Sequence, residues 1–283
     1  MQLEGKVVVI TGGSTGIGRS VAELMGERGA RLVLAARRAD RLAATVDALK
    51  AAGRSVIGVP TDIADESEAM ALADAAYAEF GRVDVAFLNA GIAGGDNLLD
   101  PDLASWKASI DANLYGLLHC IKAFVPRMIA AGERCSVTAT TSGAGIHGTA
   151  YRSAPYATTK SAQLTVMECL YAQARDAGAP MHVGVVVPPL VRTNLAGDDM
   201  SVWEQVEASL QKAGGPSLIE PEDFARVVLD GIEQERFWIE GSMEDDERYF
   251  AGRLGSTVER TRKTIAAKAR AMSDHEPPDR YLW

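Results

Sequence analysis

The stretch KVVVITGGSTGIG, residues 6–18, decides the fold of this chain. Its apolar run from Lys6 to Ile10 predicts a buried strand, and the glycines that follow predict a tight turn. A helical pattern then runs to Arg28 and stops at Gly29, and a second strand is expected from Arg31 to Ala35. This strand–turn–helix–strand order predicts a βαβ unit, and with it a parallel sheet.

The glycine-rich turn is suited to holding a diphosphate. A helix N-terminus with free backbone N–H groups favours an anion, and glycine lets the main chain approach that anion closely. We therefore expect a dinucleotide-binding loop, the alternative being a glycine turn that holds no ligand. The loop residues expected to contact the dinucleotide are Gly12, Ser14, Thr15, Gly16, Ile17 and Gly18.

The end of the second strand should select the dinucleotide. About 20 residues beyond the glycines, an acidic residue would accept the ribose 2′-OH of NAD. Arg37 and Arg38 stand there instead, and a guanidinium suits the 2′-phosphate of NADP. NADP(H) is therefore favoured over NAD(H), unless both arginines are simply solvated. Asp40 is interpreted as the N-cap of the next helix.

Composition narrows the class of protein. The chain has 283 residues, of which 47% are hydrophobic, so it can form one large α/β domain or two small ones. Its net charge of −9 argues against nucleic acid or an anionic membrane as the main partner, and no apolar run approaches the ~18 residues of a membrane span. Cys120, Cys135 and Cys169 are expected to be reduced core residues of a cytoplasmic protein. The histidines are scattered, so we expect no metal site.

Further strands are predicted at residues 55–59, 83–88, 136–140, 182–187 and 237–239. Small or polar residues follow several of them, and the ligand crevice of an open parallel sheet lies at the carboxyl ends of its strands. We expect Asp62, Ile63, Asn89, Ala90 and Gly91 at this crevice.

Two helices carry features of their own. Asp65 and Glu68 predict a capping box at the start of one helix. A helix around Trp106 to Met128 contains Asn113, which is unfavourable there without a partner. That partner is either a local carbonyl or a more distant group.

A tyrosine and a lysine lie four residues apart in Tyr156-Ala157-Thr158-Thr159-Lys160. A helix places them on one face, one turn apart. A nearby ammonium would lower the pKa of the phenol, which is the adjustment that a general acid/base requires. The spacing alone is also met by chance on the edge of an amphipathic helix.

These residues together resemble the short-chain dehydrogenase/reductase family from about Leu3 to Ile239. The match consists of Thr11-Gly12-x-x-x-Gly16-Ile17-Gly18, Asp62, Asn89-Ala90-Gly91, Asn113, Ser142, Tyr156-x-x-x-Lys160 and the turn from Pro188 to Thr193. The resemblance implies an α/β, doubly wound Rossmann fold, with a seven-stranded parallel sheet and helices on both faces. It also implies a homotetramer or homodimer.

The resemblance implies roles for these residues. Tyr156 would be the general acid/base, and Lys160 would lower its pKa and bind the nicotinamide ribose. Ser142 would hold the substrate oxygen, with Thr141 as the alternative, and Asn113 would position a water linking Lys160 to solvent. The cofactor contacts would extend to Pro188, Val191 and Thr193. One departure is Pro188-Pro189, where the family usually has Pro-Gly.

The sequence specifies the substrate pocket less precisely than the cofactor-binding residues. By position, the pocket residues are Ile92, Ala144, Ile146, Tyr151, Pro189 and Leu195. They are mostly apolar, which predicts a hydrophobic or aromatic secondary alcohol or its ketone as substrate. A single dehydrogenase domain is expected over residues 1–242, with a lid at about 194–216. Residues 243–283 are expected to form a helical extension and tail.

Two other functions use the same scaffold. A regulator that senses a dinucleotide would keep the glycine loop but would need neither Tyr156 nor Lys160. An isomerase or epimerase would hold its cofactor tightly through the reaction.

Overall fold

The computed structural model describes residues 1–147, 153–197, 201–212 and 218–240. The sequence-based expectations for Tyr151 and for the extension at 243–283 lie outside these residues. The described chain forms a seven-stranded, all-parallel sheet in the order β3-β2-β1-β4-β5-β6-β7. The strands are β1 Val7–Thr11, β2 Arg31–Ala36, β3 Val56–Pro60, β4 Val85–Leu88, β5 Cys135–Thr140, β6 Met181–Val187 and β7 Trp238–Glu240. The predicted doubly wound fold is confirmed.

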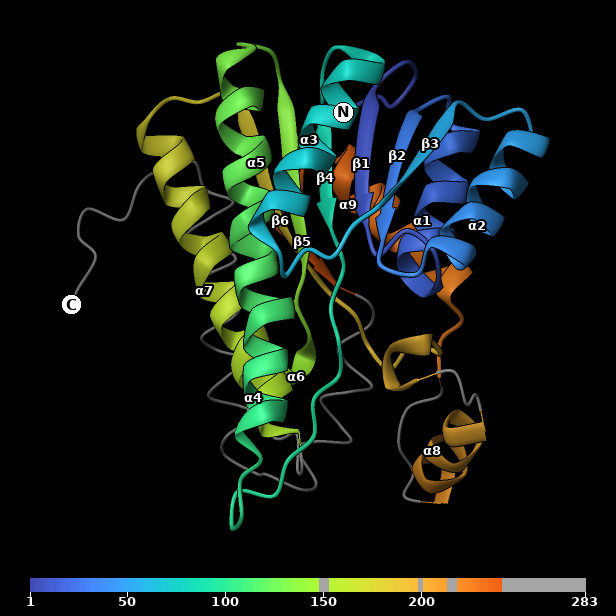
Figure 1. Cartoon of the computed structure of the whole chain (residues 1–283), viewed down its shortest axis with the longest axis vertical. Helices are drawn as coiled ribbons and strands as arrows, with labels where there is room; N and C mark the ends of the chain where they lie inside the picture. Colours follow the sequence, from blue (N-terminus) through green and yellow to red (C-terminus); the bar gives the residue numbers. More distant parts are fainter. Residues whose placement is uncertain (148–152, 198–200, 213–217, 241–283) are drawn as a thin grey trace.

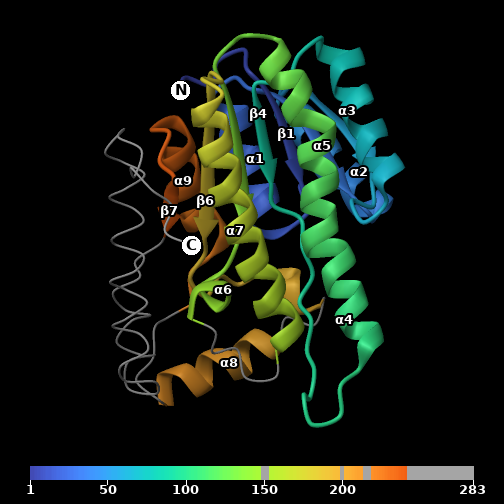
Figure 2. The same ribbon diagram turned by 90° about the vertical axis from the view of Figure 1, so that its left-hand side faces the viewer.

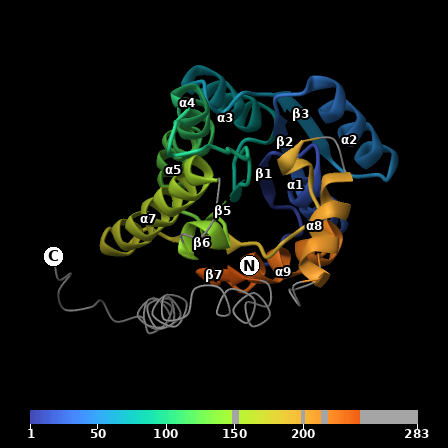
Figure 3. The same ribbon diagram turned by 90° about the horizontal axis from the view of Figure 1, so that it is seen from below.

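Helices cover both faces of the sheet (Figure 3). One face packs against α1 Gly16–Glu27, α2 Ala39–Ala51 and α9 Pro221–Glu233. The other packs against α3 Glu66–Phe80, α5 Gly116–Ala130 and α7 Ala154–Asp176. The central strands are buried on both faces because each face has its own helix layer, which explains their continuous apolar runs.

The remaining elements gather at the carboxyl ends of the strands (Figure 1). They are α4 Leu103–Ser109, a π-helical turn η1 Ile110–Tyr115, α6 Gly143–His147, a 3₁₀ turn η2 Asn194–Ala196 and α8 Ser201–Lys212. In Figures 1 and 2, α6 and α8 lie beyond the lower ends of the strands. The chain leaves β1 toward β2 and β3 and later returns to β4 beside β1, so the strand order reverses between β1 and β4. Such a reversal point is where open α/β sheets bind ligands.

Several local expectations were wrong in detail. Asp40 lies inside the first turn of α2, and Arg38 occupies the N-cap position. Asp65 does cap α3, but Glu68 accepts the N–H of Asp62 instead of that of Asp65, so the capping box is only half formed. The single helix expected over 106–128 is three segments, because the π-helical turn interrupts it. Cys169 is exposed, whereas Cys120 and Cys135 are buried as expected.

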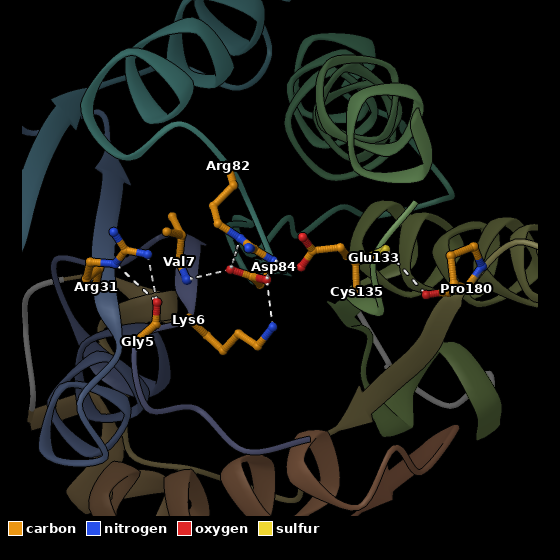
Figure 4. A network of polar contacts seen from close by, with 9 residues as sticks. All are labelled: Gly5, Lys6, Val7, Arg31, Arg82, Asp84, Glu133, Cys135 and Pro180. Atoms are coloured by element: carbon orange, nitrogen blue, oxygen red, sulfur yellow. Dashed lines mark hydrogen bonds and ion pairs between the residues drawn. The ribbon is translucent and has the colours of Figure 1, made fainter. Parts of the chain in front are cut away.

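A buried carboxylate joins two strands at the end of the sheet that lies away from the crevice (Figure 4). Asp84 is 1% exposed and accepts hydrogen bonds from Lys6 Nζ at 3.0 Å, from the Val7 N–H at 2.9 Å and from Arg82. These donors hold the pKa of Asp84 below its usual value, against the opposing effect of burial. The ion pairs therefore tie β1 to β4 at the end away from the crevice. Within the described residues, no helix is long and apolar enough to cross a membrane.

Candidate functional site

A cavity of about 860 Å³ opens at the carboxyl ends of the strands. It reaches from the end of β2 across β1 and β4 to the turn after β6. The sequence-predicted residues that line it are Gly12, Ser14, Thr15, Gly16, Ile17, Arg37, Arg38, Asp62, Ile63, Asn89, Ala90, Gly91, Ile92, Ser142, Ala144, Tyr156, Lys160, Pro188, Pro189, Val191, Thr193 and Leu195. Gly18, Asn113 and Ile146 were also expected at the site but do not line the cavity, and Ile146 packs against the core.

The glycine loop is shaped for a close approach of main chain. Gly12 and Gly16 have φ values of +69° and +53°, in the left-handed region that glycine adopts readily. A Cβ on Gly18 would lie 2.3 Å from the carbonyl oxygen of Gly12, so only glycine fits there. The side chain of Thr15 does not cap α1, which leaves the first N–H groups of that helix for an anion.

Two oppositely charged side chains lie at the end of the cavity beside β2 and β3. Arg37 Nη1 lies 4.0 Å from Asp62 Oδ2, and their side chains are 58% and 41% exposed. An ion pair of that length and exposure is weak, so Arg37 can turn to a phosphate at little cost.

Asn89 ties three strands together at the reversal point. Its amide donates to the carbonyl of Thr11, and its oxygen accepts from Thr140 Oγ1 at 3.0 Å. The hydroxyl of Thr11 in turn accepts the N–H groups of Asn89 and Ala90. Thr11 and Thr140 end β1 and β5, the two strands that flank β4. Thr11 was expected only as part of the glycine motif and Thr140 was missed, although a polar residue at the end of a buried strand was the available signal for both.

Asn113 is fully buried in the π-helical turn. Its side chain pairs with both backbone groups of Ile92, accepting the N–H at 2.8 Å and donating to the carbonyl at 3.0 Å. It also donates to Thr159 Oγ1 on α7. The partner is therefore distant in sequence, and the alternative of a local carbonyl is wrong. A single π turn within a helix frequently marks a functional site.

Tyr156, Lys160 and Ser142 converge on the cavity from α7 and from the end of β5. Ser142 is hydrogen-bonded to the Tyr156 hydroxyl. The alternative hydroxyl, Thr141, is buried and donates to the carbonyl of Val186 at 3.1 Å. Lys160 Nζ lies 5.6 Å from the centre of the Tyr156 ring and donates to the carbonyl of Thr140 at 2.8 Å.

The electrostatics differ from the expectation that Lys160 lowers the pKa of Tyr156. Burial raises the pKa of the Tyr156 hydroxyl, and its hydrogen bond to Ser142 partly opposes this. Burial also lowers the pKa of Lys160 to about 7. The physical reason is that desolvation penalises both charged forms, while the ammonium hydrogens point to other acceptors. A phenol with a raised pKa stays protonated at neutral pH, so Tyr156 carries the proton that it could donate, although burial makes it a weaker acid than a free phenol.

Two further residues belong to the site: Trp203, from the expected lid, and Gln163, which the sequence analysis missed. Trp203 on α8 lines the cavity, and its Nε1 donates to the carbonyl of Thr193 at 2.6 Å, which anchors the described part of the expected lid. Gln163 is buried one turn after Lys160 and accepts from Lys160 Nζ at 2.9 Å. A polar residue at i+3 from Lys160, on the same face of its helix, was the available signal for Gln163.

Several known proteins are similar to this chain in sequence and fold. The short chain dehydrogenase family profile matches residues 6–202. An uncharacterized oxidoreductase of Listeria monocytogenes is 35% identical over 236 residues, covering 83% of this chain and 93% of that protein. A 1-deoxy-11-beta-hydroxypentalenate dehydrogenase of Streptomyces avermitilis is 30% identical over 247 residues, covering 84% and 85%.

A solved structure extends the likeness to the fold. The crystal structure of a short chain dehydrogenase/reductase from Burkholderia phymatum, in complex with NAD, superposes with a TM-score of 0.77 at 29% identity. The match covers 100% of this chain and 99% of that one. With the glycine cradle, the parallel sheet and the Tyr156–Lys160 pair in place, the chain belongs to the short-chain dehydrogenase family of oxidoreductases.

Proposed function

We propose that this oxidoreductase uses NADP(H) to interconvert a hydrophobic or aromatic secondary alcohol and its ketone. The observation that carries the proposal is the shared cavity. At one end of the cavity, the hydroxyl of Tyr156 is hydrogen-bonded to Ser142, and at the other end lie Arg37 and Arg38. Proton chemistry and dinucleotide recognition are thereby joined in one space.

The chain's own groups would act on the substrate oxygen. The Tyr156 hydroxyl, kept protonated by burial, donates its proton in ketone reduction and accepts one in alcohol oxidation. Ser142 holds the same oxygen and stabilises the charge that develops on it. Lys160 supplies a buried cation one helical turn away. The cofactor, when bound, supplies or accepts the hydride.

The residues present fit a nicotinamide dinucleotide. Gly12, Gly16 and the start of α1 form a cradle that a side chain would fill. Arg37 and Arg38 favour the 2′-phosphate of NADP(H). The Burkholderia relative is in complex with NAD, so NAD(H) is the alternative cofactor.

The character of the lining supports a neutral, apolar substrate. Among the described lining residues, the charged side chains are Arg37, Arg38, Asp62 and Lys160, and the first three lie at the ends of β2 and β3. The lining also includes the apolar residues Ile92, Ala144, Pro189, Leu195 and Trp203. The name of the Streptomyces relative, a dehydrogenase of a hydroxy compound, agrees with an alcohol or ketone as substrate.

The test is an assay of nicotinamide absorbance against a panel of aromatic and aliphatic ketones and alcohols. Tyr156→Phe removes the proton donor while keeping the ring, so we expect activity to fall at least about a hundredfold with NADPH binding retained. Wild type and Tyr156→Phe that bind NADPH but are equally inert across the panel would favour the non-catalytic regulator. Cofactor that remains bound through purification would favour an isomerase or epimerase.

The proposal extends to assembly and location. We propose a homotetramer or homodimer formed through the helices that carry Asn113 and Tyr156. The exposed apolar side chains of Leu103, Tyr115 and Leu118 support this, because they lie along α4, η1 and α5. Light scattering that returned the mass of a single chain would contradict it. A cytoplasmic location is proposed from the three unpaired cysteines.

A further inference from the structure

Gln163 lies beside the reacting centre without lining the cavity. It is 2% exposed, on α7, three residues after Lys160. Its neighbours along the buried face of this helix include Thr159 and Met167. A buried amide in such a place is costly unless both of its ends are hydrogen-bonded.

Both ends of the Gln163 amide are bonded. Its Oε1 accepts from Lys160 Nζ at 2.9 Å, and its Nε2 donates to the backbone carbonyl of Asn113 at 2.5 Å. The reverse orientation would point an NH₂ at an ammonium and an oxygen at a carbonyl, so these two partners determine which way the amide faces. The amide is therefore a bridge from α7 to the π-helical turn.

We propose that Gln163 is a positioning residue that holds the Lys160 ammonium beside Tyr156 and takes the place of a water between Lys160 and the Asn113 carbonyl. The family resemblance implies a water that Asn113 positions and that links Lys160 to solvent. In this chain the bridging group is a side chain that makes both contacts directly. The inference rests on the function proposed above.

The bridge has two chemical consequences. Thr140 and Gln163 supply two oxygen acceptors to the Lys160 ammonium, and its third N–H is left for the cavity that Lys160 lines. An amide accepts and donates through different atoms, so it fixes Lys160 in place but does not pass protons as a water does.

Removal of the Gln163 oxygen should reduce the ammonium form of Lys160. Burial already brings the pKa of Lys160 to about 7, so one acceptor fewer lowers it further. The groups that face Lys160 are Tyr156 on α7, the Thr140 carbonyl at the end of β5, the neutral Asn113 on η1 and the backbone at Gly91. Tyr156 is the titratable group among them.

The experiment compares Gln163→Leu, Gln163→Glu and Gln163→Asn with wild type. Leucine fills similar space without hydrogen bonds, glutamate keeps an acceptor for Lys160, and asparagine shortens the bridge. Gln173→Leu is the matched control, because Gln173 is an exposed glutamine on the same helix. The first measurement needs neither cofactor nor substrate. It follows the pKa of Lys160 by NMR of ¹³Cε-labelled lysine, with the signal assigned through Lys160→Met.

We expect the pKa of Lys160 to fall by about one unit in Gln163→Leu and to rise in Gln163→Glu. In the activity assay we expect kcat of Gln163→Leu to fall about tenfold with KM within about twofold, because the bridge acts on the reacting centre and not on substrate binding. The pH profile should move to lower pH by the same interval as the pKa. Gln163→Glu should recover most of kcat.

The outcomes separate this inference from the proposed function. If Tyr156→Phe is inactive but Gln163→Leu keeps both the wild-type Lys160 pKa and the wild-type pH profile, the positioning role is wrong and the function stands. If wild type is inert across the panel, the function fails, and the NMR titration still decides whether Gln163 controls Lys160. Should Gln163→Leu fail to fold, Gln163→Asn and Gln163→Glu carry the same test, and an unchanged Lys160 pKa in both overturns the inference.

Discussion

Replacement of Arg37 by alanine should separate NADPH from NADH. Arg37 lines the cavity just after the end of β2 and is 58% exposed, and its ion pair with Asp62 spans 4.0 Å. Hydrogen bonds to a charged group are worth about 1.5–3 kcal/mol, and solvent exposure puts this one near the lower end. A loss of about 1.5 kcal/mol weakens NADPH binding about tenfold.

NADH lacks the 2′-phosphate, so its affinity should change less than about twofold. Asp62 also loses its partner in the variant, which leaves a carboxylate able to accept a ribose hydroxyl. The double variant Arg37→Ala/Arg38→Ala should weaken NADPH binding further, because both arginines line the same end of the cavity.

Titration of nicotinamide fluorescence measures both affinities. Repeating it at low and high salt adds a second readout, since a phosphate contact at an exposed site is screened by ions. The NADPH affinity of wild type should depend on salt more than that of Arg37→Ala. The control is Arg134→Ala, because Arg134 has a similar exposure of 55% and pairs with Glu235 away from the cavity. Equal losses of NADPH and NADH affinity would refute the assignment of Arg37 to the 2′-phosphate.

Three further predictions concern the glycine loop, the ion pair that holds α8 and a buried histidine. Gly18→Ala should abolish dinucleotide binding and lower the free energy of unfolding by about 1–3 kcal/mol, because its Cβ would meet the Gly12 carbonyl at 2.3 Å. Dye-monitored melting and NADPH titration would measure the two effects, and NADPH binding as tight as that of wild type would contradict the prediction. Glu207→Gln should raise KM for substrate about two- to fivefold with NADPH affinity unchanged. The reason is that Arg192 Nη2 donates to Glu207 of α8 at 2.9 Å, and a partly exposed ion pair contributes up to about 1 kcal/mol. An unchanged KM would mean that this ion pair does not hold α8 over the substrate. Burial lowers the pKa of His182 from 6.5 to about 4. Between these pH values the unfolded chain binds a proton that the folded chain does not, so the free energy of unfolding falls as pH is lowered, by up to about 3 kcal/mol. Urea denaturation from pH 7 to pH 4 should show a smaller fall in the free energy of unfolding for His182→Asn than for wild type.

The glycine loop and the strand pattern could be predicted from the sequence because their causes are local. A positive φ favours glycine whatever lies around it, and a run such as Val7 to Ile10 needs helices on both faces of its sheet wherever it is placed. The same holds for Tyr156 and Lys160, since helical geometry alone sets them one turn apart. These local rules and the family resemblance together were enough to predict the fold and most of the lining of the cavity.

The chain's hydrogen-bond partners were decided by the tertiary structure. Asn113 pairs with the backbone of Ile92, and Gln163 joins Lys160 to the carbonyl of Asn113, 50 residues away. The pKa values of Tyr156 and Lys160 depend on their burial, which their spacing along a helix does not determine. A side chain's periodicity tells which face of an element it occupies, but the group it meets there depends on how distant segments pack. The sequence alone therefore determined the scaffold and the chemical groups, and the packing of distant segments determined how those groups are held and charged.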